Sequence, residues 1–133
     1  MSNAAYRLAP VAVLAAVTAG SAVAAPQATA HTITAVTVTP GLGGGFGTGC
    51  TYQVSATVDA DAYRITFLDN DYPIRGNQNL QVSGNTASLA WTPSTTGTHV
   101  ITALFTVADQ APVSTTVQVD STGLNLGSAC FAQ

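Results

Sequence analysis

The sequence predicts an all-β protein, a seven-stranded β-sandwich with one disulfide. Hydrophobic residues alternate with a period of two rather than 3.6, and turn-forming residues separate runs of about six residues. Hydrophobic residues make up 47% of the 133, which is enough for the core of one domain. Charged residues make up 7%, with no Lys or Glu and a formal net charge of −3. This balance excludes binding to nucleic acids through phosphate neutralisation and favours an extracellular β-domain.

The first segment of the chain is expected to be a secretory signal peptide, residues 1–24. Arg7 precedes an apolar run of 13 residues, shorter than the roughly 20 that a spanning helix needs. Cleavage after Ala24 is favoured; cleavage after Ala30 and an uncleaved anchor are the alternatives. Residues 25–31 are expected to be a disordered N-terminal segment. The mature protein is then secreted, extracellular or associated with the cell envelope, without a membrane span.

The first four strands are expected in the N-terminal half of the mature chain. Residues 31–39 are rich in β-branched side chains, and residues 50–58 alternate without a break. Residues 63–67 alternate again, and residues 72–83 are interpreted as one bent strand. Asp69-Asn70-Asp71 has the composition of a tight turn between the last two.

The remaining strands are expected at residues 87–91, 99–105 and 113–119, each with an apolar inward row. No helical pattern interrupts them, which favours a sandwich over residues 32–119. Residues 120–133 then form a C-terminal tail.

The two cysteines, Cys50 and Cys130, are expected to form a disulfide because secretion permits one. Free thiols and an intermolecular link are the alternatives. If seven strands run alternately up and down, the start of the second and the end of the seventh lie at one pole, where Cys130 can reach Cys50. The bridge would pin the tail there and close a loop of about 80 residues, a stabilisation of roughly 4 to 5 kcal/mol.

Three segments carry a resemblance to a known family. Residues 65–69 (ITFLD) with Pro73 and Ile74, residues 83–93 (SGNTASLAWTP) and residues 97–103 (GTHVITA) resemble bacterial immunoglobulin-like repeats. The resemblance implies an immunoglobulin-like sandwich with Greek-key connections. It also implies a non-enzymatic role, since such modules act as spacers or adhesive domains in surface and secreted proteins. A single copy with two cysteines and a tail departs from the usual tandem array.

His99 occupies the position that immunoglobulin-type folds often give to a Tyr at the start of the sixth strand. The segment Thr95-x-Gly97-x-His99-x-Ile101 has the corresponding spacing. We therefore expect the His99 side chain to hydrogen-bond the local backbone at this corner.

Catalytic and metal chemistry find little support in the residue inventory. Only His31 and His99 are available for a triad, there is no G-x-S-x-G motif, and no catalytic residue or cofactor is predicted. No metal site is predicted either, because calcium needs six to eight oxygens and Asp is a common turn former. The weak calcium candidates are Asp59, Asp61, Asp69 and Asp71.

A contact surface is a further possibility that the sequence raises. The glycine-rich loop 41–49 lacks the G-x-G-x-x-G pattern and a following Lys, so a flexible connection is expected rather than a phosphate site. Within it, Leu42 and Phe46 either pack against the end of the sandwich or form a contact patch. Tyr72, next to Pro73, is expected to be exposed and available to stack on a sugar or a partner side chain.

The sequence therefore favours a secreted, non-enzymatic immunoglobulin-like domain that acts as a binding or structural module of the adhesion type. Its partner would be an extracellular protein or a wall polysaccharide. The alternative is a secreted carrier of a small hydrophobic ligand or a protein inhibitor. A pocket between the sheets would favour the carrier, and a rigid exposed loop at residues 41–49 would favour the inhibitor.

Overall fold

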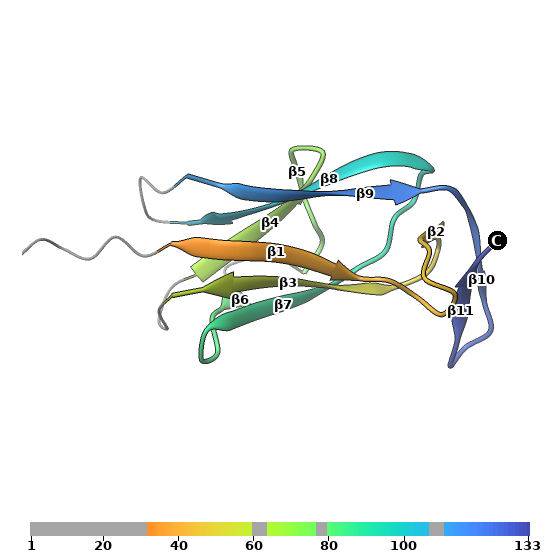
Figure 1. Cartoon of the computed structure of the whole chain (residues 1–133), viewed down its shortest axis with the longest axis horizontal. Coiled ribbons are helices and arrows are strands. Elements are labelled where there is room, and N and C mark those ends of the chain that lie inside the picture. The colour runs from red at the N-terminus through yellow and green to blue at the C-terminus, as the bar shows by residue number, and fades with distance from the viewer. Residues whose placement is uncertain (1–31, 60–63, 77–79, 107–110) are drawn as a thin grey trace, which may run out of the picture.

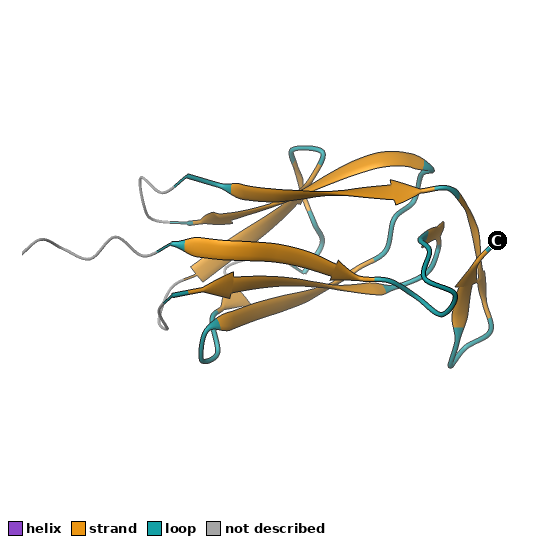
Figure 2. Cartoon of the chain, in the orientation of Figure 1, coloured by secondary structure: helices purple, strands orange, loops and turns teal. Residues whose placement is uncertain are grey.

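The computed structural model describes residues 32–59, 64–76, 80–106 and 111–133. These ranges contain strands and turns but no helix, which confirms the predicted all-β class (Figure 2). Consequently the described part of the chain has no helix long and apolar enough to cross a membrane. The predicted signal peptide and the segment 25–31 lie outside the described residues.

The first sheet is antiparallel, in the order β1-β3-β7, with strands β1 (Ile33–Thr39), β3 (Tyr52–Val58) and β7 (Thr86–Trp91). Buried and more exposed residues alternate along β3 as its sequence predicts. Ala56 pairs with Val36 on one side and Ala87 on the other. The apolar face of this sheet is therefore continuous across all three strands.

The second sheet has the order β5-β4-β8-β9, and its pairs are also antiparallel. Its central strands are β4 (Arg64–Asp69) and β8 (Gly97–Phe105), and β9 (Val113–Val119) lies beyond β8. The short strands β5 (Tyr72–Pro73) and β6 (Leu80–Gln81) both pair with β4.

The single bent strand expected over residues 72–83 is therefore wrong, because two short strands occupy this region. After β5 the chain turns inward, and the Ile74 side chain is buried in the core. Gly76 then adopts a positive φ of 79°, a conformation that ends an extended strand and suits glycine. These two features bend the chain away from β4 before it returns as β6.

One hydrophobic core joins the two sheets, which form the two layers seen in Figure 1. The predicted inward rows supply most of it, as their period of two requires. The largest fully buried side chains are Phe67, Ile65, Ile101, Val54, Val58, Val119, Pro93 and Cys50.

A third, small sheet covers one pole of the molecule (Figure 1). It has the order β11-β10-β2, with strands β2 (Gly47–Thr48), β10 (Ser121–Asn125) and β11 (Cys130–Ala132). The predicted Cys50–Cys130 disulfide is confirmed, with Cα atoms 5.7 Å apart, and it fastens this sheet to the start of β3. The tail expected at residues 120–133 is thus folded into strands.

Two parts of the glycine-rich segment 41–49, which was expected to be a flexible connection, join the same sheet. Gly47 pairs with Ser121 in a parallel arrangement, and Leu42 forms a bridge to Phe131. A Cβ on Gly47 would lie 2.7 Å from the Cα of Gly123, closer than real Cβ contacts come. Glycine at position 47 therefore allows the close approach of two backbones.

Candidate functional site

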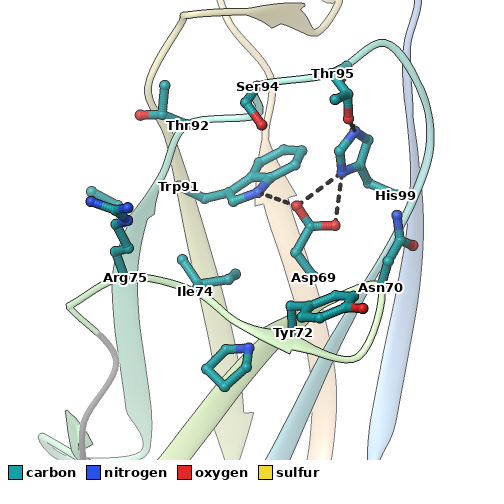
Figure 3. A pocket seen from close by; sticks show the side chains of 12 residues that line it. Asp69, Asn70, Tyr72, Ile74, Arg75, Trp91, Thr92, Ser94, Thr95 and His99 are labelled. Carbon is teal, nitrogen blue, oxygen red and sulfur yellow. Dashed lines mark hydrogen bonds and ion pairs between the residues drawn. The ribbon is translucent and has the colours of Figure 1, made fainter.

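A surface pocket of about 720 Å³ lies where β4 and β7 end and β8 begins. Its walls are the β4–β5 turn with the residues after β5, and the connection between β7 and β8 (Figure 3). The volume falls in the range of roughly 300–1,000 Å³ that is typical of small-molecule sites. The lining residues are Asp69, Asn70, Tyr72, Pro73, Ile74, Arg75, Ala90, Trp91, Thr92, Ser94, Thr95 and His99.

The Asp69 carboxylate joins the two walls of the pocket. It accepts a 2.9 Å hydrogen bond from Nε1 of Trp91, which ends β7. Nδ1 of His99 on β8 lies 2.7 and 2.9 Å from its two oxygens (Figure 3). Asp69 is 21% exposed and His99 5% by side chain, so this network is largely shielded from water. Three strands are thereby fixed relative to one another by one carboxylate.

The second ring nitrogen of His99, Nε2, lies 3.0 Å from the backbone oxygen of Thr95. The side chain therefore bonds the local backbone at the corner before β8, as its position in the sequence led us to expect. The carboxylate of Asp69 and the carbonyl of Thr95 are both acceptors. Each ring nitrogen of His99 therefore faces an acceptor oxygen.

The His99 geometry bears on catalysis. A general base of the triad type needs a free lone pair on Nε2 that faces a nucleophilic hydroxyl. Here Nε2 faces the Thr95 carbonyl at 3.0 Å, and the Thr95 hydroxyl is more distant at 3.5 Å. The arrangement can fix the corner and orient Asp69, and it does not present an activated hydroxyl.

Asn70 holds the β4–β5 turn against the neighbouring strand. Its Oδ1 accepts a 2.9 Å hydrogen bond from the backbone N–H of Val100, and its Nδ2 donates to the oxygen of Thr98 at 3.2 Å. The backbone N–H of Asn70 also donates to the oxygen of Val100 at 3.0 Å. The β4–β5 turn, one wall of the pocket, is therefore bonded directly to β8.

A row of aromatic rings connects the pocket to the disulfide pole. Trp91 packs edge-on against His99 at 5.4 Å between ring centroids and contacts Tyr52 at 5.9 Å. Tyr52 in turn contacts Phe46 at 5.0 Å, and its hydroxyl accepts a 2.6 Å hydrogen bond from the N–H of Gly47. Phe46 therefore packs against the end of the sandwich, one of the two roles considered for it.

Two large side chains on the pocket lining point to solvent. Tyr72 is 77% exposed, and Arg75 is exposed. Within the described residues, neither side chain makes a hydrogen bond, ion pair or ring contact. These groups are available to a ligand, whereas Asp69 and His99 are already bonded.

The structure separates the other candidate contact residues from Tyr72. Leu42 is 57% exposed and lies at the disulfide pole, bridged to Phe131. The glycine-rich segment and the β4–β5 turn thus contribute to different surfaces.

The four calcium candidates are not brought together. Asp59 accepts hydrogen bonds from the N–H and the hydroxyl of Thr32, at 2.8 and 2.9 Å. Asp69 belongs to the network above, and Asp71 is exposed in the turn. Asp61 lies outside the described residues. Among the residues that the structure describes, no group of three or more His, Cys, Asp or Glu could hold a metal ion.

Sequence reasoning placed Trp91 in the core and Asp69 in a turn, and it missed the bond between them. A signal was present, because a buried indole N–H and a buried imidazole both require hydrogen-bond partners. Asp69 is an acceptor at the end of β4, the strand that pairs with β8. The pocket is formed by two segments that are distant in the sequence, so no local sequence pattern predicts it.

No protein-family model matches the chain, and neither a curated protein nor a solved structure matches it.

Proposed function

We propose that this protein is an extracellular, non-enzymatic binding module with an immunoglobulin-like sandwich, and that it holds its ligand in the pocket beside Tyr72. The observation that carries the proposal is the pocket itself. Its walls are cross-linked by Asp69, Trp91 and His99, while Tyr72 and Arg75 are exposed on its lining. A rigid cavity with free polar and aromatic groups is the usual form of a binding site.

The strand order supports the immunoglobulin-like part of the proposal. When β2, β6, β10 and β11 are left aside, seven strands remain in the described part of the chain. The first, second and fifth of these, which are β1, β3 and β7, form one sheet. The third, fourth, sixth and seventh form the other, and apart from the fourth strand this is the division of the constant-type immunoglobulin fold. The bond from His99 to Thr95 corresponds to the hydrogen bond that a corner Tyr makes to the backbone a few residues upstream.

The disulfide supports an extracellular location. Such bonds form and persist in oxidising compartments and are rare in the cytosol. Residues 1–24, with their apolar run and A-x-A motif, supply the expected export signal. Retention at the cell envelope would then bring the pocket to a wall polysaccharide or a surface protein.

The test is to express the full gene in a related secreting host and to measure how the protein divides between washed envelopes and medium. We expect retention on envelopes, and an intact mass that shows a cleaved leader and two hydrogens lost from the cysteines. Free monomer in the medium alone would contradict the envelope role, and unprocessed mass in the membrane fraction would contradict secretion.

A variant that blocks the pocket tests whether the pocket is responsible for retention on envelopes. Ser94→Trp places a large ring in the pocket lining, and Thr116→Trp places the same ring on an exposed position of β9. We expect Ser94→Trp to move the protein into the medium and Thr116→Trp to leave it on the envelopes. Equal retention of the two variants would exclude the pocket as the binding site.

A protein inhibitor is the second candidate, and a specific surface favours it. Four exposed apolar side chains lie on the small sheet or next to it: Leu42, Leu124, Leu126 and Phe131. Exposed apolar patches of this kind often contact proteins. Loss of envelope retention in Leu126→Ser, but not in Ser94→Trp, would show that this surface, rather than the pocket, makes the protein contact.

A further inference from the structure

We infer that the pocket beside Tyr72 binds an acidic saccharide, with Arg75 receiving the sugar carboxylate and Tyr72 packing against a sugar ring. The inference rests on the proposed binding function and specifies its ligand. Sugars present an apolar C–H face, several hydroxyls and, in uronic acids, one carboxylate. The pocket offers a counterpart for each of the three.

Arg75 is the counterpart for the carboxylate. It lies on the pocket lining, it is exposed, and it has no acidic partner among the described residues. A guanidinium binds a carboxylate through two parallel N–H···O bonds, which favours this anion over a neutral group. The nearby negative charge of Asp69 is already bonded to His99 and Trp91 and is not left facing the ligand alone.

Tyr72 is the counterpart for the C–H face of the ring. With 77% of its surface exposed, it presents a flat apolar surface next to the polar groups of the pocket. Burial of an aromatic ring contributes strongly to binding at little entropic cost, because the side chain has few rotatable bonds. In Figure 3 the ring lies below Asp69, on the turn that Asn70 fixes to β8.

The counterpart for the sugar hydroxyls is the opposite wall. Thr92, Ser94 and Thr95 bring exposed hydroxyl side chains to the connection between β7 and β8. The Thr92 hydroxyl is bonded to that of Thr51 at 2.8 Å, and the Thr95 hydroxyl lies 3.5 Å from His99, so Ser94 offers the hydroxyl with no such neighbour. Hydroxyls both donate and accept, so they match sugar hydroxyls in either role. The bonds of Asp69 to Trp91 and His99 hold this wall in place before a ligand arrives, which reduces the ordering cost of binding.

A peptide added as an extra strand is disfavoured at this pocket. The adjacent edge strand, β5, has only two residues. Its second residue, Pro73, has no N–H to offer a partner strand. Strand addition depends on a row of such backbone bonds, so the pocket favours a sugar over an extended peptide.

The experiment measures binding of the full mature chain to short oligomers of galacturonate, mannuronate and glucuronate by calorimetry. The methyl ester of each oligomer is the matched neutral ligand. We expect at least one acid to bind, with its methyl ester roughly tenfold weaker or worse because the Arg75 contact is lost. Binding of no acid, or equal binding of acid and ester, would overturn the inference.

Two variants test whether the acid binds at Arg75 and Tyr72. Arg75→Gln and Tyr72→Ala are expected to weaken binding of the acid by roughly tenfold or more. Arg64→Gln, which changes the exposed Arg of β4 outside the pocket, should bind as the parent does. Both pocket residues are exposed, so unchanged urea unfolding curves would confirm that the variants fold. Unaltered affinity in Arg75→Gln would overturn the inference.

These results are distinguishable from those on the proposed function. If Ser94→Trp releases the protein from envelopes but Arg75→Gln does not, the pocket is a binding site for a ligand other than an acidic sugar. If neither variant affects retention, the proposed function and this inference both fail.

Discussion

At the scale of single residues, one carboxylate organises the pole of the molecule that carries the pocket. Asp69 accepts hydrogen bonds from Trp91 and His99, side chains that are 2% and 4% exposed as residues. Buried donors of this kind are costly to leave unpaired, by about 1–3 kcal/mol each. Asp69 thus has a structural role that its place in a turn did not suggest.

Replacement of His99 tests this role. His99→Ala removes the bonds to Asp69 and to the Thr95 oxygen, so we expect the free energy of unfolding to fall by about 2–4 kcal/mol. Urea denaturation would measure it. Thr98→Ala, one residue away, loses only an exposed hydroxyl bond to Gln118 and should change stability by less than about 1 kcal/mol. Equal curves for His99→Ala and the parent would show that the network does not stabilise the fold.

At the scale of elements, the β4–β5 hairpin is shaped by its backbone. Asn70 and Asp71 have φ values of 47° and 69°, both in the left-handed region. Two consecutive positive φ values characterise the type I′ turn that two-residue hairpins prefer. Asn suits the first position and makes side-chain bonds to β8, whereas Asp at the second is less favourable than Gly. The backbone geometry of the turn therefore explains why Asn and Asp occur at positions 70 and 71, without a bound metal ion.

The second position of this turn supplies the next prediction. Asp71→Gly should raise the free energy of unfolding by about 0.5 kcal/mol, because Gly adopts positive φ without steric cost. Asp71→Ala should lower it by a similar amount, since Ala has no side chain to compensate. Thermal unfolding of the two variants beside the parent gives the comparison. A Gly variant no more stable than the Ala variant would contradict this account of the turn.

At the scale of the whole molecule, a covalent link between distant segments assembles one pole. The Cys50–Cys130 bridge spans 80 residues and joins the start of β3 to β11. Among the described residues, the β10–β11 hairpin pairs by backbone bonds with the rest of the protein only at two-residue β2 and the Leu42–Phe131 bridge. With so little backbone pairing to the main sheets, we expect the small sheet to depend on the disulfide, unlike the two main sheets with their shared core.

Removal of the disulfide should therefore destabilise the small sheet more than the two main sheets. In Cys50→Ala/Cys130→Ala we expect the free energy of unfolding to fall by roughly 2–5 kcal/mol. Hydrogen exchange should show lost protection in β10 and β11, while β3 and β8 stay protected. Reduced and alkylated parent protein is the matched comparison and should behave alike. Unchanged protection of β10 and β11 would mean that backbone pairing alone holds the small sheet.

Most of the strands could be predicted from the sequence because their signal is local. The alternation in residues 50–58 and 99–105 places alternate side chains on one face, whatever the rest of the chain does. The division of residues 72–83 into β5 and β6 escaped prediction, since it depends on the core accepting Ile74. The strands within residues 41–49 and 120–133 escaped it as well, because β2 pairs with β10, which is distant in the sequence, and β10 pairs with β2 and β11.

The sequence by itself determined the all-β class, the inward rows and the single possible cysteine pair, since periodicity and a count of two cysteines suffice for them. Only the tertiary structure decided that Asp69 meets Trp91 and His99, and that Tyr72 and Arg75 share a pocket with Ser94. The two Asp69 contacts join residues 22 and 30 positions apart on different strands. Such distances are set by strand order and register, and no local run of residues encodes them.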